Sequence, residues 1–230
     1  VLHDNGGSIA VSIHEGSVTL SYGVHVTGLR SSDQVYDMAV AAMVCVMRQL
    51  CGPTWRPDSV LLPRRRPADI RPYRDHFMAP LRFDSILAAI VFPERCLHQP
   101  IADADPLVRE LLADNAATAI ARRDPVIDGD VRKAIRLLLL TRRCSRAEVA
   151  RRLGLHERAL GRQLQASGTT FQSLLDETRE DIARQLLCDT NTPAARVATA
   201  LGYRDASVFT RAFTRWTGQT PSEFRARLPR

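Results

Sequence analysis

The chain of 230 residues lacks the sequence features of several protein classes. Its longest apolar run, Met38 to Met47, ends at Arg48. It falls short of the roughly 18–20 apolar residues that span a membrane. No basic segment followed by an apolar core and a cleavage site opens the chain, so we expect no signal peptide. Because the sequence begins at Val1 without an initiator methionine, we expect an N-terminal portion to be missing.

The five cysteines and six histidines form no recognisable ligand pattern. No C-x-x-C pair is present, and the odd number and scattered spacing of the cysteines indicate reduced thiols in a reducing compartment. The histidines lack the H-E-x-x-H spacing of zinc ligands. No Gly-rich phosphate loop, Ser/His/Asp set or close carboxylate pair stands out. We therefore expect no catalytic residue, no metal and no cofactor.

Positive charge is concentrated in the second half of the chain. Residues 1–124 contain 13 Arg and no Lys against 14 acidic residues, a net charge of −1. Residues 125–230 contain 18 Arg and Lys133 against 11 acidic residues, a net charge of +8. A basic domain beside a nearly neutral one indicates a polyanionic partner. On charge alone, a solvated basic surface is an equally good explanation.

The first half mixes strand and helix signals and predicts an α+β domain. Alternating apolar residues on both sides of Glu15-Gly16-Ser17 predict a hairpin. Apolar residues at i, i+3 and i+4 predict a helix from Val35 to Leu50, capped by Ser32 and ended by Gly52-Pro53. The pattern then predicts a strand at 59–62, an exposed loop at 63–72, a buried strand at 83–92 and a helix at 105–123.

Two features of this half suggest ligand binding, each with a simpler explanation. Arg64, Arg65 and Arg66 could bind a carboxylate or phosphate, but a solvated loop is favoured. Met38, Met43 and Met47 could line an apolar pocket, but core packing is favoured.

The second half is helical throughout and contains a helix-turn-helix pattern. A helix over 131–140 comes first. Ser145-Arg-Ala-Glu148 is a capping box that begins a short helix ending at Gly154. A second helix then runs from Glu157 to about Ala166 and is closed by Gly168. A short helix, a turn containing glycine and a second helix are typical of the helix-turn-helix motif.

This unit recurs 48 residues later. The repeated positions are Val149, Ala150, Leu153 and Gly154, which reappear as Val197, Ala198, Leu201 and Gly202. Thr192-Pro193 is predicted to cap the first helix of the second copy, and Asp205 the second helix, which ends at Gly218. The two units therefore span about 145–166 and 192–216.

An amphipathic helix over 171–188 joins the two units, and Thr220-Pro-Ser-Glu223 opens a last helix. Eighteen helical residues span about 27 Å, and successive major-groove faces of DNA lie about 34 Å apart. One chain could thus read two adjacent major-groove segments. A helical solenoid is the alternative, but two copies are fewer than such arrays usually need.

At these residues the chain resembles the AraC/XylS family of bacterial transcription regulators. The second unit carries the more specific match, LGYRDASVFTRAFTRWTGQTPSEFR at 201–225, and the first carries EVARRLGLHERALGRQL at 148–164. Residues 55–105 resemble, more weakly, the effector domain of one branch of this family. The resemblance implies an effector-binding or dimerisation domain at 1–124, N-terminally truncated, and a DNA-binding domain at 125–230.

The sequence departs from the family pattern at three positions. His156 replaces the usual Ser or Thr cap before the first recognition helix and is a poorer cap. Ala194 replaces a larger aliphatic residue, which predicts loose packing. Gly161 lies inside the recognition helix at a cost of roughly 1 kcal/mol against Ala. It either permits close approach of DNA or reflects drift, and drift is slightly favoured.

Candidate DNA contacts follow from the helical pattern and the resemblance. Leu160 and Leu164 face inward on the first recognition helix, as do Val208, Phe209, Phe213 and Trp216 on the second. Arginine can donate two hydrogen bonds to guanine, worth about 1–3 kcal/mol of discrimination, and the resemblance favours Arg158, Arg162 and Arg211 for this role. The other candidates are Glu157, Ala159, Gln163, Ala206, Ser207 and Thr210, with Arg146, Arg151, Arg204 and Arg215 at phosphates or in solvent.

The sequence thus predicts a non-enzymatic, sequence-specific transcription regulator that binds an operator in double-stranded DNA. The resemblance implies a small-molecule effector, a cytoplasmic location on the nucleoid, and activation more often than repression. It also admits RNA polymerase and a second copy of the chain, joined through the N-terminal domain, as partners. Two alternatives stay open: an alkyl-transfer repair enzyme fused to a DNA-binding module, and a nonspecific nucleic-acid or protein scaffold.

Overall fold

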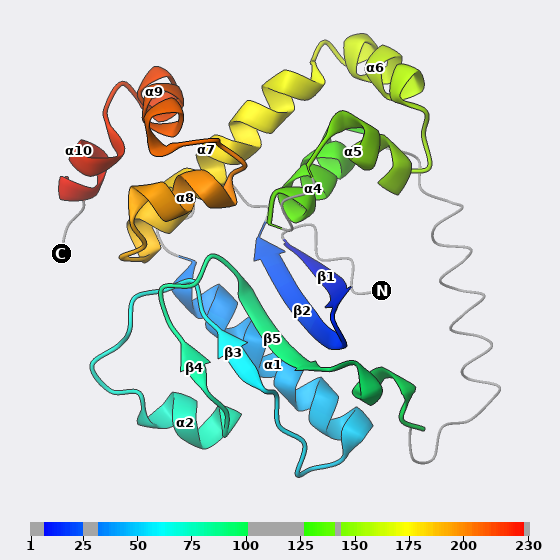
Figure 1. Ribbon diagram of the computed structural model, residues 1–230, viewed down its shortest axis with the longest axis vertical. Coiled ribbons are helices and arrows are strands. Elements are labelled where there is room, and N and C mark those ends of the chain that lie inside the picture. Colours follow the sequence, from blue (N-terminus) through cyan, green and yellow to red (C-terminus); the bar gives the residue numbers. More distant parts are fainter. Residues whose placement is uncertain (1–6, 25–31, 101–126, 141–143, 228–230) are drawn as a thin grey trace.

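The computed structural model describes residues 7–24, 32–100, 127–140 and 144–227, which form a sheet domain and a helical domain (Figure 1). This confirms the predicted fold class, an α+β domain followed by an all-α domain with two helix-turn-helix units. The predicted helix at 105–123 and the predicted boundary near residue 125 lie outside the described residues.

The N-terminal domain is built on a five-stranded sheet of order β1-β2-β5-β3-β4. Neighbouring strands are antiparallel except for the parallel pair β3 and β4. The predicted hairpin is confirmed, with Ile9 opposite Tyr22, whereas the predicted strand at 83–92 begins only at residue 88. The strands are β1 Gly7–His14, β2 Ser17–Val24, β3 Ser59–Leu61, β4 Leu81–Arg82 and β5 Ala88–Pro93.

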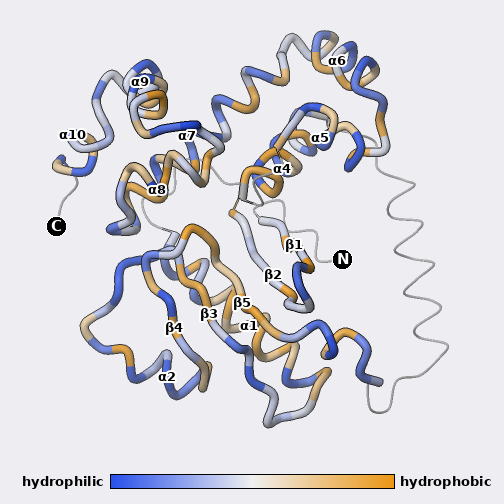
Figure 2. Tube along the Cα trace, viewed as in Figure 1, coloured by the Kyte–Doolittle hydropathy of each residue, from blue (hydrophilic) through white to orange (hydrophobic). Residues whose placement is uncertain are grey.

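Helix α1, Asp33–Cys51, packs on the sheet (Figure 1), and hydrophobic residues occur along much of its length (Figure 2). It buries Tyr36, Val40, Met43, Val44 and Met47, and the Tyr36 ring meets Tyr22 edge to face. Two of the three methionines therefore belong to the core, as favoured above, while Met38 is 68% exposed. The sheet domain thus has its own core, separate from that of the helices.

One prediction for this domain, the exposed loop at 63–72, is wrong. The stretch 63–72 is not an exposed loop throughout, because Pro63 is buried and the Arg64 side chain is only 19% exposed. Arg64 pairs with Asp37 and lies 2.7 Å from the Tyr73 hydroxyl, so it binds a carboxylate of its own domain. Tyr73 belongs to a helix that the pattern missed, α2 Arg71–Phe77, and a short 3-10 helix, η1 Glu94–His98, follows β5.

The predicted cap of α1 is also wrong. Ser32 occupies the N-cap position but makes no capping hydrogen bond with its side chain. Its hydroxyl donates instead to Asp189 Oδ2 at 2.8 Å, across the boundary between the two domains. A tertiary partner has replaced the local one.

The helical domain follows the predicted order closely. Its long helix α7 packs against α4 and carries units α5–α6 and α8–α9 near its two ends (Figure 1). The helices are α4 Ile127–Leu140, α5 Arg146–Arg152, α6 Glu157–Ala166, α7 Phe171–Asp189, α8 Ala194–Ala200, α9 Ala206–Thr217 and α10 Pro221–Ala226. The 19 residues of α7 correspond to about 28 Å at 1.5 Å per residue.

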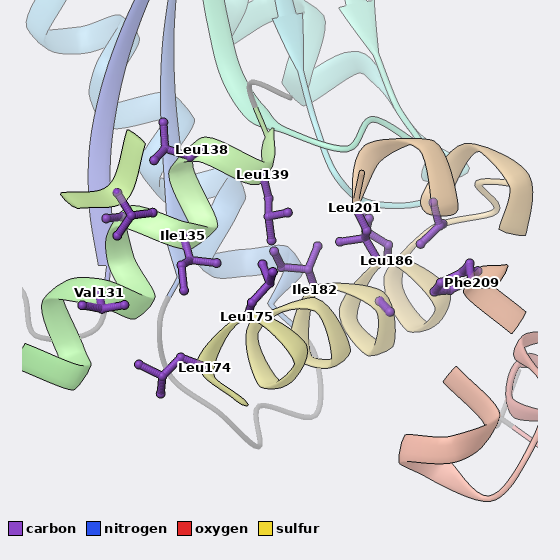
Figure 3. Packing of buried hydrophobic residues seen from close by; sticks show 14 of the residues in the cluster. Val131, Ile135, Leu138, Leu139, Leu174, Leu175, Ile182, Leu186, Leu201 and Phe209 are labelled. Atoms are coloured by element: carbon purple, nitrogen blue, oxygen red, sulfur yellow. The ribbon is translucent and has the colours of Figure 1, made fainter. Parts of the chain in front are cut away.

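One apolar core unites these helices (Figure 3). The predicted apolar face of α7 is buried except for the half-buried Phe171, and it contacts residues from both helix-turn-helix units. Ala194 packs against this core, and Ile86 of the sheet domain does so as well. The two helix-turn-helix units therefore pack on one hydrophobic core centred on α7.

Candidate nucleic-acid interface

The two helix-turn-helix units share the same hydrogen-bonded turn. In the first unit the Leu155 amide donates to the Ala150 carbonyl at 2.9 Å. In the second, 48 residues later, the Tyr203 amide donates to the Ala198 carbonyl at 3.0 Å. Gly154 and Gly202 precede these amides with φ of +68° and +77°, a region that other residues reach only with strain. The sequence repeat is therefore a structural repeat.

The recognition helices begin differently. Asp205 caps α9, because its carboxylate accepts a hydrogen bond from the Val208 amide at 2.9 Å, which lowers the pKa of Asp205. His156 stands at the equivalent position of α6 and makes no capping hydrogen bond with its side chain, as its poor propensity predicts. The first amides of α6 thus lack the side-chain acceptor that α9 has.

Other predicted caps divide into confirmed, partial and wrong. The Thr220–Glu223 capping box is complete. Ser145 accepts from the Glu148 amide at 3.1 Å, while the Glu148 carboxylate pairs with Arg151. Thr192 does not cap α8, which has Pro193 at its N-cap position; the Thr192 hydroxyl donates to the Asp84 carbonyl of the sheet domain at 3.0 Å.

On α6 the predicted inner and outer faces are in place. Leu160 and Leu164 are buried, whereas Glu157, Arg158 and Arg162 are exposed on the outside of the helix. Ala159 and Gln163 are half-buried, so they lie at the edge of the exposed face.

On α9 the same division holds with larger side chains. Phe209 and Phe213 are fully buried, and Val208 and Trp216 are half-buried. Ser207 and Arg211 are exposed, while Ala206 and Thr210 are half-buried. The Thr210 hydroxyl donates to the Ala206 carbonyl at 2.8 Å, so this hydroxyl is bonded to the backbone of its own helix.

The four arginines expected at phosphates have different surroundings. Arg204 is 89% exposed and lies 3.4 Å from the Asp205 carboxylate. Arg215 pairs with Asp176 of α7 at 3.1 Å, and Arg151 pairs with Glu148 of its own helix. Such exposed pairs are weak and can exchange for a phosphate at little cost.

Arg146 explains the unusual glycine of α6. Its Nη2 atom donates to the Glu157 carbonyl at 3.1 Å, and a Cβ atom at position 161 would lie 2.0 Å from that nitrogen. Gly161 therefore leaves room for an arginine to lie along the recognition helix. The sequence offered close approach of DNA or drift, and the structure adds this third explanation.

Sequence reasoning missed Arg179, which ties the second unit to α7. Its Nε atom donates to the Leu201 carbonyl at 3.0 Å, and its guanidinium lies 4.7 Å from the centre of the Tyr203 ring. Burial raises the pKa of Tyr203 to about 12, so its hydroxyl stays protonated. An arginine beside the apolar stripe of the linker helix is the only sequence signal for this contact.

The geometry places both recognition helices on the side of the helical domain away from the sheet (Figure 1). Each exposes arginine from a unit packed on the shared core, Arg158 and Arg162 on α6 and Arg211 on α9. Two such helices carried by one linker helix define a class of DNA-binding domain.

Three observations on the described residues concern alkyl transfer, metal binding and membrane spanning. Burial raises the pKa values of the Cys51, Cys144 and Cys188 thiols, that of Cys144 to about 11, which opposes the thiolate that alkyl transfer requires. Within the part of the chain that the structure describes, no group of His, Cys, Asp and Glu residues is arranged to hold a metal ion. Among the same residues, no helix is long and apolar enough to cross a membrane.

Comparison with known proteins matches both halves of the chain. A profile of a helix-turn-helix domain matches residues 149–227, and a profile of the N-terminal arabinose-binding domain of the AraC transcription regulator matches residues 1–101. The ornithine utilization regulator of Pseudomonas aeruginosa is 33% identical over 162 residues, which are 69% of this chain and 47% of that protein. The chain therefore matches about half the length of this relative.

Two further proteins are similar over nearly the whole chain. The HTH-type transcriptional regulator VirS of Mycobacterium tuberculosis is 26% identical over 227 residues, 98% of this chain and 67% of that protein. The crystal structure of the transcriptional regulator CdpR from Pseudomonas aeruginosa is 29% identical, covering 95% of this chain and 71% of that one, with a TM-score of 0.38.

The chain belongs to the AraC family of helix-turn-helix transcription regulators. The family and these relatives are transcription regulators rather than enzymes, which corrects the alternative of a fused repair enzyme.

Proposed function

We propose that this chain binds a double-stranded operator in a sequence-specific manner, with α6 and α9 in two adjacent major-groove segments. The observation that carries the proposal is the repeated unit on a shared core, with one α7 helix of about 28 Å between two arginine-bearing helices. The net charge of +8 over residues 125–230 supplies attraction to phosphates.

In this proposal each exposed group has a role set by its position. Arg158, Arg162 and Arg211 read guanine edges, with Glu157, Ala159, Gln163, Ala206, Ser207 and Thr210 beside them. Arg146, Arg151, Arg204 and Arg215 contact phosphates, which fix the register of the chain on the duplex without reading sequence.

The N-terminal domain receives a small-molecule effector or joins two copies of the chain, and the bound regulator acts with RNA polymerase, most often to activate. This part rests on the match to an arabinose-binding domain over residues 1–101. The effector, the operator and any dimer are open to direct test by binding experiments.

The central test is selection of binding sites from random duplexes by the purified chain. We expect enriched sequences that contain two conserved segments about one helical turn apart, because two reading helices are carried on one face. Enrichment of no sequence over random DNA would instead support the nonspecific scaffold.

Single arginine variants then assign each helix to one segment. Arg162→Ala should relax base preference within one segment and Arg211→Ala within the other, each by about 1–3 kcal/mol of discrimination. Arg95→Ala, which removes the same charge from an exposed position of the N-terminal domain, is the matched control. Unchanged selectivity across a panel of selected sites would contradict the assignment.

Salt dependence separates phosphate contacts from base contacts. The logarithm of the affinity should fall with the logarithm of salt concentration, by a slope of about 0.9 for each phosphate that is neutralised. Arg204→Ala should reduce that slope without altering sequence preference, measured by fluorescence anisotropy. A flat salt response of the unaltered chain would argue against DNA binding.

A further inference from the structure

The C-terminal end of α7 is completed by residues from outside the helix. The last four carbonyl oxygens of an α-helix have no partner within it. In α7 all four are bonded, two of them by Arg65 of the sheet domain, whose amide and guanidinium both donate. The donors are Thr190 N to Leu186 O at 3.2 Å, Arg225 Nε to Leu187 O at 3.4 Å, Arg65 Nη2 to Cys188 O at 3.2 Å and Arg65 N to Asp189 O at 2.8 Å.

The turn at 190–193, which leads from α7 into α8, is held by Asp84 of the sheet domain. The Asn191 amide donates to Asp84 Oδ1 at 2.7 Å, and the Thr192 hydroxyl donates to the Asp84 carbonyl at 3.0 Å. Asp84 itself has a left-handed φ of +53° and donates its amide to the Arg64 carbonyl at 2.8 Å. Thr192 is buried, so its hydroxyl depends on the Asp84 carbonyl for a partner.

Helix α1 contacts the same end of α7. Ser32 donates to Asp189 Oδ2, and Gln185 Nε2 donates to the Tyr36 hydroxyl at 2.8 Å. Burial raises the pKa of Asp189, while the hydrogen bonds from Ser32 oppose that shift. Removing one partner of such a bond while the domains stay packed would leave the other group without a hydrogen bond, which costs free energy.

These contacts join the interior of the sheet domain to the second reading unit. Arg64, next to Arg65 in the chain, pairs with Asp37 of α1 and with Tyr73 of α2. On the other side, the turn at 190–193 runs directly into α8, the first helix of the second unit. The first unit precedes α7 and the second follows it. The six interdomain hydrogen bonds above all lie at the C-terminal end of α7, next to the second unit.

We propose that the N-terminal domain positions the second helix-turn-helix unit, through a junction formed by Arg65, Asp84 and the turn at 190–193, and that the effector acts on DNA recognition by α9 through this junction. Arg65 and Asp84 are positioning residues, since they contact the backbone that leads into α8 rather than DNA. An effector can shift an equilibrium between two arrangements of the domains only through contacts that differ between them. We place those contacts at the junction, because it carries the interdomain hydrogen bonds described above. The inference rests on the proposed function.

The test compares two duplexes in binding experiments with the full chain. One duplex is a selected site with both segments, and the other has the segment read by α9 replaced by random sequence. Arg65→Met removes the donor to Cys188 while keeping an unbranched side chain, and Asp84→Ala removes the acceptor of the Asn191 amide. Both variants should lose about 5-fold or more in affinity for the two-segment duplex, the lower range of allosteric coupling. Neither should change on the other duplex.

Arg66→Met is the matched control, because Arg66 is the exposed neighbour of Arg65 and should leave both affinities unchanged. Thr192→Val, a swap of equal volume, replaces Arg65→Met if that variant does not fold, as judged by circular dichroism. Equal losses on both duplexes, or no loss on either, would overturn the inference. Failure of the unaltered chain to prefer selected over random duplexes would instead overturn the proposed function.

Discussion

The two helix-turn-helix units have the same turn but differ in how firmly their recognition helices are built. In the second unit, Asp205 caps α9, and Phe209 and Phe213 fill its core. In the first unit, His156 leaves the start of α6 without a side-chain cap, and Gly161 inside the helix lowers its helix propensity. The turn that leads into the second unit is also hydrogen-bonded to Asp84 of the sheet domain. The second unit thus has a capped recognition helix and hydrogen bonds to the sheet domain at its start, whereas the recognition helix of the first unit has no side-chain cap.

Core truncation should reveal this difference with the largest effect. Phe213→Ala should cost about 3–5 kcal/mol of unfolding free energy, and Leu164→Ala, its counterpart in the first unit, should cost less. Phe213 lies 5.4 Å from Phe224 and 5.7 Å from Phe209, measured between ring centres, so its removal disrupts an aromatic cluster. Urea denaturation measures the loss of unfolding free energy in each variant. A larger loss for Leu164→Ala would reverse the comparison.

Exchanging the caps should have a smaller effect, of opposite sign in the two units. Asp205→Ala should lower the free energy of unfolding, and His156→Asp should raise it by a smaller amount, because each changes an acceptor at a helix start. Thermal unfolding at pH 7 measures both. An equal loss from the two variants would show that His156 already acts as a cap.

The contribution of Asp205 should also depend on pH. Its pKa is lower in the folded chain than in the unfolded one, because the carboxylate accepts from the Val208 amide. Its stabilisation is therefore fully present above the unfolded pKa of about 4 and is lost as pH falls through the lower, folded value. The difference in unfolding free energy between the unaltered chain and Asp205→Ala should vanish at low pH. A difference that persists there would point to a role other than charge.

Filling the glycine of α6 should have the smallest effect on stability and a separate effect on DNA. Gly161→Ala should gain at most about 1 kcal/mol of helix stability, reduced by the lost bond between Arg146 and the Glu157 carbonyl. Its new methyl group would displace Arg146, so DNA affinity should fall about as far as in Arg146→Ala. The double variant Arg146→Ala/Gly161→Ala should bind no worse than either single one. Additive losses would mean that Gly161 is needed for another reason.

Most of the helical domain could be predicted from sequence because its signals are local. Asp205 and the Thr220–Glu223 box act within one turn of their own helices, and the 48-residue repeat fixed the placement of both units. Ser32 and Thr192 have the same local signature, yet each bonds to the other domain. Residue type and spacing cannot distinguish these cases, because the competing acceptor lies 157 residues away for Ser32 and 108 for Thr192.

The candidate contacts were predictable as a face of a helix but not as individual surroundings. Exposure of Arg158, Arg162 and Arg211 follows from the burial of leucine or phenylalanine on the opposite side. Two other contacts depend on how neighbouring helices cross: the pairing of Arg215 with Asp176 and the position of the Arg146 guanidinium beside Gly161. In the sheet domain, a run of arginine and proline predicts that Arg64 is solvated in a loop. Its side chain instead pairs with Asp37 and bonds to the Tyr73 hydroxyl, partners that the local sequence does not reveal.

The turn at 190–193 takes its shape from three distant parts of the chain, since Arg65, Asp84 and Arg225 all bond to it or to the helix end before it. A chimera that joins the helical domain of this protein to the sheet domain of a relative would separate these partners. If the junction acts as proposed, such a hybrid should respond to an effector only when residues 65 and 84 of this chain are carried into the new sheet domain. Residues 65 and 84 are therefore the first positions to match when a foreign sheet domain is joined to this helical domain.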